Sequence, residues 1–541
     1  MTKKYFHLIF YCLIFSLNQT TSAQYNFQRL IGGSSQERGQ ALFQTSDGGY
    51  LYNAATLSYG SGSADGFFVK TDSQGLLSWS KAYGTAAFDN SEFAIETYDS
   101  KLVGVGATYF PSGTNADVMM FKTNPQGQLL WSKTYGGGGN ESVVHMIETS
   151  DHGYALVGFT RSIGSGSEDI LFIRTDENGD TIFTRSYGTP ESEVGISIVE
   201  DSTGEFIICG KQTRVINGFL YADGILLRTD PAGNILWTKL YGDSLWEELE
   251  SVNIALDGGL ISCGSTTTFG AGKYDILAMK TSAQGNIEWA YAYGGAEIDA
   301  SYGVLCNSDS TFTISGYTNS YGYGHQQRGD DSTNIFLMRI NSLGDTLWMR
   351  TYGDGLQDEA YRCSAANDGG YLVSGFTTNY TFQDSAQMMM IKTDSVGYTG
   401  CHEYTSHPEK TAALLQDSSV VFSQSSGLVN GNISLIEMLV NTYDNDACLY
   451  TGMADEMNSK KLFIFPNPID DEQKIRIQSS TELMFVRILN LEGRLMKEIS
   501  LSVPAGEISV TPEAHRLSSG IYFIQAGNVD GQLLMAKLIV Q

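Results

Sequence analysis

The sequence Trp131-Ser132-Lys133-Thr134-Tyr135-Gly136 is the clearest copy of a pattern that returns along the chain: an aromatic residue followed four positions later by Tyr-Gly. The other copies are Trp79/Tyr83, Phe183/Tyr187, Trp237/Tyr241, Trp289/Tyr293 and Trp348/Tyr352, with a degenerate first copy at Phe27/Ile31. Successive copies lie 52 residues apart in four steps, 54 in one and 59 in the last. A fixed period of this size predicts a repeat architecture.

Each copy reads as four strands separated by turns. In the third copy they are Glu141 to Glu148, Tyr154 to Thr160, Ile170 to Thr175 and Thr181 to Tyr187. Four-stranded sheets arranged around an axis are the blades of a β-propeller, and a β-solenoid is the weaker alternative. Because the chain opens with a fourth-strand motif and the seventh copy ends at its third strand, we expect one seven-bladed ring over residues 24–400, closed by the N-terminal strand.

Composition agrees with an all-β fold. The 541 residues include 60 Gly and only 9 Pro, as expected of many strands joined by tight turns. The formal net charge is -27, so the surface repels phosphate backbones and nucleic acid is not an expected partner.

The N-terminus reads as a secretory signal peptide over residues 1–23. Lys3 and Lys4 precede an apolar run, and Thr21-Ser22-Ala23 places small residues at a cleavage site. The run is too short for a transmembrane anchor, and no later segment is long enough either.

Two charged positions recur in all seven copies. An acid stands five residues after each motif glycine, and a base ends each third strand. The acids are Glu37, Asp89, Glu141, Glu193, Glu247, Asp299 and Asp358. One interpretation is a carboxylate ring around the axis that holds a cation, with calcium as the candidate ion and no other cofactor expected. The other is a set of repeated structural contacts to the bases or to turn amides.

The loops between second and third strands are the candidate binding surface, because loops carry function on rigid scaffolds. The sixth copy deviates most and combines aromatic rings with amides and charges, a composition that suits a sugar or peptide ligand. Its candidate binding residues are Tyr321, Tyr323, His325, Gln326, Arg328 and Asp330. A solvated insertion without a ligand is the alternative.

Catalytic motifs are scarce. The chain has neither a His-Glu-x-x-His zinc motif nor a Gly-x-Ser-x-Gly nucleophile motif. We therefore expect no enzyme activity, although a pair of loop carboxylates that cleaves glycosides stays open as an alternative.

Cys401 and Cys448 bracket a segment without a motif copy. In an exported protein this pair predicts a disulfide. We interpret residues 401–460 as a disulfide-closed excursion, expected to form an irregular hairpin beside the ring, followed by a linker.

The turn-and-tryptophan segments, such as Thr71 to Trp79, resemble the docking motif of quinoprotein-type propellers, in which the indole packs against the neighbouring blade. Residues 461–541 predict a small β-sandwich from composition, and they resemble the type A C-terminal sorting domain of the type IX secretion system. The resemblance rests on Phe465-Pro466-Asn467-Pro468, on Val486 to Arg494, on Leu517 to Phe523 and on Lys537 to Val540.

This resemblance implies a type IX secretion partner for residues 461–541 and a secreted or surface location on a Gram-negative bacterium, with the tail commonly removed. The resulting interpretation is an exported propeller that binds a glycan, a peptide or a surface polymer. The alternatives are an extracellular polysaccharide hydrolase or lyase and a structural component of the cell coat.

Overall fold

The computed structural model describes residues 25–109, 115–324, 332–353, 355–378, 386–433, 435–440 and 443–446, together with seven strands between residues 462 and 540. The expected signal peptide, residues 1–23, lies outside the described residues, so it stays a prediction. The described part of the chain contains no helix that is long and apolar enough to cross a membrane.

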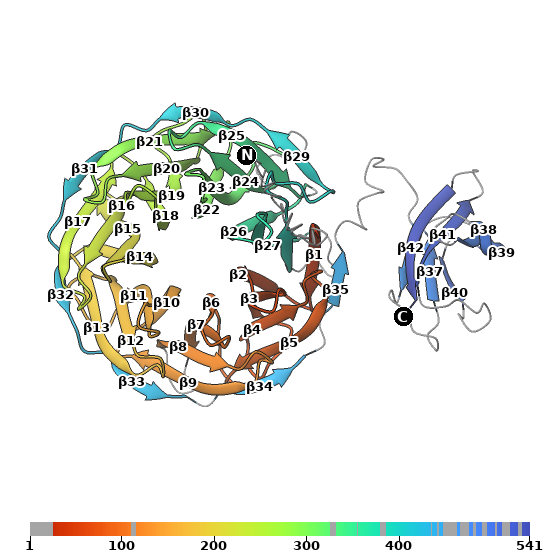
Figure 1. Cartoon of the computed structure of the whole chain (residues 1–541), viewed down its shortest axis with the longest axis horizontal. Coiled ribbons are helices and arrows are strands. Elements are labelled where there is room, and N and C mark those ends of the chain that lie inside the picture. Colours follow the sequence, from red (N-terminus) through yellow and green to blue (C-terminus); the bar gives the residue numbers. More distant parts are fainter. Residues whose placement is uncertain are drawn as a thin grey trace, which may run out of the picture. The chain divides into compact units, whose positions relative to one another are not determined.

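Seven antiparallel sheets follow one another around a ring, and we number them as blades 1 to 7 (Figure 1). Blade 1 contains β2 (Glu37–Gln44), β3 (Tyr50–Thr56), β4 (Asp65–Thr71) and β5 (Leu77–Gly84). Blade 2 contains β6 (Phe93–Glu96), β7 (Leu102–Tyr109), β8 (Ala116–Thr123) and β9 (Leu129–Gly136). Blade 3 contains β10 (Glu141–Glu148), β11 (Tyr154–Thr160), β12 (Asp169–Thr175) and β13 (Thr181–Gly188). Blade 4 contains β14 (Ser192–Glu200), β15 (Phe206–Ile216), β16 (Phe219–Thr229) and β17 (Ile235–Gly242).

The last three blades complete the ring. Blade 5 contains β18 (Glu247–Ile254), β19 (Leu260–Thr266), β20 (Asp275–Thr281) and β21 (Ile287–Gly294). Blade 6 contains β22 (Asp299–Cys306), β23 (Phe312–Thr318), β24 (Asn334–Ile340) and β25 (Thr346–Tyr352). Blade 7 contains β26 (Asp358–Ala365), β27 (Tyr371–Thr377), β28 (Gln387–Lys392) and β1 (Phe27–Gly32).

The N-terminal strand closes the ring, as expected from the sequence. β1 pairs antiparallel with β28, with Phe27 opposite Lys392 and Ile31 opposite Met388. The first strand of every blade lies nearest the axis (Figure 1). The seven-bladed β-propeller is therefore confirmed.

The Tyr-Gly motif joins neighbouring blades. In six copies the tyrosine hydroxyl donates a hydrogen bond to the carbonyl of a turn glycine in the next blade, as Tyr187 does to Gly233 at 2.7 Å. The indole of Trp79 packs on Gly127 of the same kind of turn, where a Cβ would lie 2.8 Å from the ring. Two features of this position require glycine. The indole occupies the space that a side chain would need, and the φ of +72° lies in the left-handed region that favours glycine. The docking role expected of the tryptophan segments is confirmed.

The repeated bases pair with a second set of repeated acids. Each base at the end of a third strand forms an ion pair with the aspartate in the turn between the first and second strands of its own blade. These pairs are Lys70–Asp47, Lys122–Asp99, Arg174–Asp151, Arg228–Asp201, Lys280–Asp257, Arg339–Asp309 and Lys392–Asp368. The bases therefore hold the blade turns and do not pair with the seven predicted ring carboxylates.

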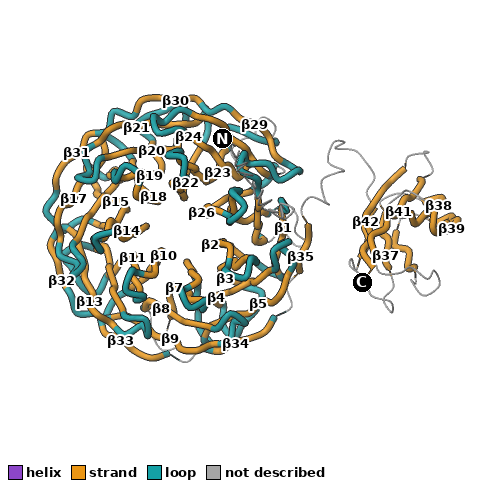
Figure 2. The backbone as a smooth tube through the Cα atoms, in the orientation of Figure 1, coloured by secondary structure: helices purple, strands orange, loops and turns teal. Residues whose placement is uncertain are grey.

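A fifth strand completes each sheet, whereas the sequence predicts four per blade. The segment after the ring runs back around its outer rim and adds one short strand to every blade, in the order 6, 5, 4, 3, 2, 1, 7 (Figures 1 and 2). We call residues 403–446 the belt. Its strands are β29 (Glu403–Ser406), β30 (Glu409–Ala412), β31 (Gln416–Ser419), β32 (Ser423–Ser425), β33 (Val429–Asn432), β34 (Ile436–Leu439) and β35 (Tyr443–Asp446).

The belt is held by apolar anchors between its strands. Ala413, Phe422 and Leu435 are buried and join the apolar clusters between neighbouring blades. Ion pairs add to this attachment, including Lys239–Asp417 at 2.7 Å and Lys81–Glu437 at 2.5 Å. The irregular hairpin expected for this segment is wrong, because the belt pairs with the otherwise open edge of each fourth strand. Cys448 lies outside the described residues, so its pairing with Cys401 stays a prediction.

The C-terminal unit comprises residues 446–541 and is compact by itself. Its described strands form two antiparallel sheets, as a small β-sandwich requires. The first contains β36 (Leu462–Phe465), β37 (Ile475–Ser479) and β40 (Gly506–Val510). The second contains β38 (Leu483–Leu489), β39 (Leu495–Val503), β41 (Gly520–Asn528) and β42 (Leu533–Val540).

Candidate functional site

The seven predicted ring carboxylates are buried, and six of them accept hydrogen bonds from within their own part of the repeat. Glu37 is typical: its carboxylate accepts a hydrogen bond from the Gly33 amide at 2.8 Å and from the Thr56 hydroxyl at 3.0 Å. The same amide contact holds Asp89, Glu141, Glu193, Glu247 and Asp299. For Asp358 the corresponding amide belongs to residue 354, outside the described residues. No three acidic, histidine or cysteine side chains of the described residues are grouped to hold a metal, and calcium at this ring stays a prediction.

The described tyrosines of the sixth-copy loop contact the ring and the belt. The Tyr321 hydroxyl donates to the Gly294 carbonyl at 2.8 Å, and the Tyr323 ring stacks on Tyr404 of β29 with centroids 5.9 Å apart. Both side chains thus have packing partners within the protein. The other expected binding residues, His325, Gln326, Arg328 and Asp330, lie outside the described residues.

The axial region contains a set of side chains that sequence reasoning did not identify. In six blades a β-bulge interrupts the first strand and leaves one residue without a partner on the second strand. A bulge redirects the side chains around it. The bulge residues are Gln40, Val144, Ile196, Glu250, Tyr302 and Tyr361.

Arg362, next to the bulge of blade 7, bridges the interior of the ring. Its guanidinium donates a hydrogen bond to the Val144 carbonyl of blade 3 at 3.3 Å and lies 4.9 Å from the ring centroid of Phe93 in blade 2. Blades 7 and 3 are separated by blades 1 and 2 in the ring, so the side chain crosses the axis. The His145 ring packs against the same Phe93 with centroids 4.3 Å apart.

Two carboxyl groups share this environment. Burial raises the pKa of Glu250 to about 7, the nearby Glu248 charge adds to the rise, and Lys211 and Arg362 oppose it. Burial also raises the pKa of Glu92, against the charge of Arg362. Burial, and to a smaller extent the Arg362 charge, holds the pKa of His145 well below its usual range. The Nδ1 atom of His145 accepts a hydrogen bond from the Ile198 amide at 3.2 Å. The axis therefore combines a guanidinium, an imidazole whose pKa is lowered and two carboxyl groups whose pKa values are raised.

Aromatic rings from blades 6 and 7 line one side of the axis. Tyr302 stacks on Tyr317 with centroids 6.0 Å apart and meets Tyr361 edge-on at 5.9 Å. Tyr361 in turn lies 6.0 Å from Phe376, whose other neighbour is the Arg38 guanidinium at 5.4 Å. We call these four rings the aromatic wall; its three tyrosines are half-buried and Phe376 is buried.

Carboxylates flank the aromatic wall. Glu359 precedes Ala360 and Tyr361 on β26 and is half-buried; burial raises its pKa, and Arg38 lowers it. Glu248 of β18 forms an ion pair with Lys211 at 2.7 Å. Aromatic faces beside carboxylates and a guanidinium supply both contact area and hydrogen-bonding groups for a polar ligand.

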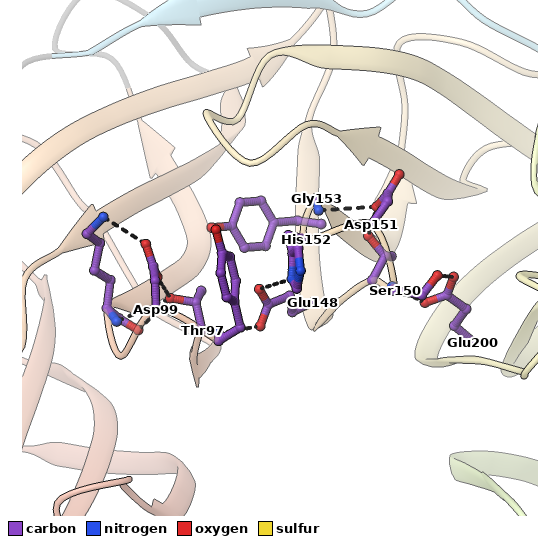
Figure 3. Close-up of polar contacts among 12 residues, drawn as sticks. Thr97, Asp99, Glu148, Ser150, Asp151, His152, Gly153 and Glu200 are labelled. Carbon is purple, nitrogen blue, oxygen red and sulfur yellow. Dashed lines mark hydrogen bonds and ion pairs between the residues drawn. The ribbon is translucent and has the colours of Figure 1, made fainter.

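The opposite end of the axis carries a different set of contacts. A cavity of about 330 Å³ between β6 and β10 is lined by Phe93, His145 and Glu148, among others. Around it, turns bond to the next blade: the Tyr98 amide donates to Glu148 at 2.9 Å, and the Ser150 amide and hydroxyl donate to Glu200, each at 2.8 Å (Figure 3). These contacts join blades 2, 3 and 4 and leave the glutamates occupied by backbone donors.

A sequence signal for the axial site exists in the repeat. Aligned on the predicted ring acids, the fourth residue after the acid is Ala41, Phe93, His145, Ser197, Ser251, Gly303 and Arg362. Arg362 is the single basic residue of that set apart from His145, which marks it as unusual. Its contacts depend on ring closure, so the sequence pattern alone does not place it beside Phe93 or Val144.

One comparison with known proteins identifies the C-terminal part of the chain. Residues 463–541 match the family model of the secretion system C-terminal sorting domain. No curated protein matches the chain in sequence. Among solved structures the chain is similar to PorZ, described as an essential bacterial surface component of the type IX secretion system of Porphyromonas gingivalis, at 10% identity and TM-score 0.33, over 92% of this chain and 69% of that one. It is also similar to a eukaryotic initiation factor at 9% identity and TM-score 0.28, over 61% and 97%.

The sorting domain indicates export to the cell surface or into the medium, and engagement with the type IX secretion machinery. The described strands of the chain ahead of it form the propeller and its belt. The chain is thus a seven-bladed β-propeller protein that ends in a secretion system C-terminal sorting domain over residues 463–541.

Proposed function

We propose that the protein is an exported glycan-binding protein whose ligand contacts the aromatic wall. The observation that supports this most is the presence of three half-buried tyrosines, Tyr302, Tyr317 and Tyr361, on adjacent blades beside half-buried carboxylates. Tyrosine faces offer apolar area at a low cost in conformational entropy. The carboxylates Glu359 and Glu250 accept hydrogen bonds from sugar hydroxyls, and Arg38 donates them.

The position of the site on the scaffold supports the same proposal. The wall is built from first and second strands of blades 6 and 7, with Arg38 from blade 1, so the paired strands on either side of each bulge position its residues. Such a preformed surface loses little side-chain freedom on binding. We further propose that the protein reaches the surface with a signal peptide over residues 1–23 and loses the sorting tail during release or attachment.

A second candidate function is cleavage of an extracellular polysaccharide. Glu250 favours it, because a carboxyl group with a pKa of about 7 is suited to proton transfer at neutral pH. Tyr302 and Arg362 lie in the same axial region and supply a hydroxyl group and a cation. In this candidate Glu250 acts as the general acid or base on a bound glycan.

A glycan array read for both retention and chain cleavage separates the candidates. Retention of one glycan class without product release supports binding, and the binding proposal is wrong if no glycan is retained. Cleavage that is lost in Glu250→Gln supports the enzyme, whereas Glu148→Gln, at the other end of the axis, serves as the matched control. If the array shows no retention and no cleavage, a structural component of the cell coat is favoured. Binding to a peptide array, with no glycan retained, assigns the wall to a protein ligand.

A further inference from the structure

Pairs of acidic or amide side chains recur at the seams between blades, and all of them are buried except Asp117, which is half-buried. An acidic or amide residue in the first half of each third strand faces the predicted ring acid of the next blade; it is the first residue in five blades, the second in β8 and the fifth in β16. A backbone hydrogen bond between the two blades holds the pair together. The Asp89 amide donates to the Ala64 carbonyl at 2.9 Å, and the Asp299 amide donates to the Tyr274 carbonyl at 2.9 Å. The seven seam pairs are Asp65–Asp89, Asp117–Glu141, Asp169–Glu193, Asp223–Glu247, Asp275–Asp299, Asn334–Asp358 and Gln387–Glu37.

Three of the seven seams do not contain two carboxylates without a compensating partner. Asn334 and Gln387 replace the first acid by an amide, and Asp223 forms an ion pair with Arg214. Two buried like charges are costly without a compensating partner. The remaining four seams carry two acids each, so a proton, a hydrogen-bond donor or a cation has to compensate them.

Among these four seams, the Asp65–Asp89 pair has the most buried carboxylate oxygens without a hydrogen-bond partner in the described structure. Asp65 and Asp89 are 1% and 0% exposed. Their Oδ2 atoms accept hydrogen bonds from the amides of Gly62 at 3.3 Å and Thr85 at 2.6 Å. Their Oδ1 atoms are both buried and without a hydrogen-bond partner among the described residues.

A third oxygen belongs to the same seam. Thr108 forms a bridge opposite Asp89, and its buried hydroxyl has no hydrogen-bond partner in the described structure. The equivalent threonines elsewhere are occupied: Thr160 donates to Glu141 at 2.8 Å and Thr56 to Glu37 at 3.0 Å. The repeat itself thus shows that this hydroxyl normally contacts the seam carboxylate, and that this seam differs.

We propose that Asp65 Oδ1, Asp89 Oδ1 and Thr108 Oγ1 bind a calcium ion between blades 1 and 2. Two carboxylates and a hydroxyl are hard oxygen donors, as Ca²⁺ requires, and backbone carbonyls or water complete its coordination. With only two charged ligands the site is a weak one, comparable to extracellular calcium modules with dissociation constants of roughly 10⁻⁴ to 10⁻³ M. The site is separate from the aromatic wall and does not depend on the proposed function.

The test uses the purified full chain after removal of divalent ions with a chelator. Calorimetric titration with CaCl₂ at pH 7.5 is expected to show one site, and thermal unfolding in 10 mM CaCl₂ a higher melting temperature than without it. Thr108→Val is expected to remove both responses. Thr160→Val, which deletes a hydroxyl already bonded to Glu141, is the matched control and keeps them.

Asp65→Asn keeps the test decisive if Thr108→Val fails to fold, because blade 6 already carries Asn334 at this position. The variant is expected to fold without calcium and to lose the calcium response. The proposal is overturned if the wild-type protein shows neither calcium heat nor a shift in melting temperature. It is equally overturned if Asp65→Asn responds to calcium as the wild type does, or if acidification stabilises the wild type while calcium has no effect.

Discussion

The tyrosine of the Tyr-Gly step is the residue that links sequence to fold most directly. Its side chain is fully buried in six copies, and its hydroxyl bonds to a glycine carbonyl of the next blade. The degenerate first copy has Ile31 in this place, so the seam between blades 7 and 1 lacks that bond. The motif is therefore an interblade contact repeated six times.

Tyr187→Phe tests this contact. The change removes the hydroxyl and leaves the buried Gly233 carbonyl without its donor, so we expect the free energy of unfolding to fall by about 1 to 2 kcal/mol. Denaturant unfolding measures it, with Tyr98→Phe as a control because that ring is 59% exposed. Equal stability of Tyr187→Phe and the wild type would falsify the role of the bond.

We expect Asp275 to make the stability of the protein depend on pH. Burial, with the Asp299 and Glu409 charges, raises the pKa of Asp275 from its ordinary 3.8 to about 6. A raised folded pKa stabilises the protein below pH 3.8, and this contribution is lost as the pH rises through 6. We expect Asp275→Asn to be more stable than the wild type at pH 8 by on the order of 1 to 3 kcal/mol, and equal to it near pH 4. Parallel pH profiles of the two proteins in thermal unfolding would contradict this.

At the scale of elements, the belt is the main departure from expectation. The ring was predictable because its motifs recur at a fixed spacing and each copy has strands of typical length. The belt has strands of three or four residues with mostly polar side chains, which gain their pairing only from the fourth-strand edges. Its only sequence signal is a set of apolar residues at spacings near seven, such as Ala413, Val420 and Leu428. Arg362 was missed for a related reason, since its contacts join blades that only the closed ring brings together.

The ends of the belt return to one place in the ring. The Cys401 carbonyl accepts a hydrogen bond from Gln28 of β1 at 2.5 Å, and β35, which ends two residues before Cys448, is the neighbour of β1 in the sheet of blade 7. This agrees with the predicted Cys401–Cys448 disulfide, which would close the belt around the propeller.

Peptide mapping without reduction is expected to recover the cross-linked pair. The double variant Cys401→Ala/Cys448→Ala is expected to lose roughly 2 to 4 kcal/mol of unfolding free energy, because the unfolded belt is no longer a closed loop. Cys306→Ala, a free and half-buried cysteine, is the control. Alkylation of both Cys401 and Cys448 in the denatured, unreduced protein would show that the disulfide is absent.

At the scale of the whole molecule, the sorting domain and the propeller have separate tasks. The C-terminal unit is compact by itself, and the propeller with its belt closes without it. Deletion of residues 463–541 is therefore expected to leave a folded propeller inside the cell envelope, detected by fractionation and surface labelling. Surface labelling at the wild-type level in the deletion strain would contradict this division. Mass analysis of the exported wild-type protein tests tail removal, which an intact C-terminus would exclude.

The most direct measurement for the proposed function is the affinity of the purified propeller for the glycan class that the array retains. Calorimetric titration of Tyr361→Ala is expected to show at least a tenfold loss of affinity, because a tyrosine at the centre of a binding site contributes about 2 kcal/mol or more and about 1.4 kcal/mol is a factor of ten. Tyr98→Ala removes an exposed tyrosine at the opposite end of the axis and is expected to bind as the wild type does. Unchanged affinity in Tyr361→Ala, or an equal loss in Tyr98→Ala, would place the ligand away from the aromatic wall.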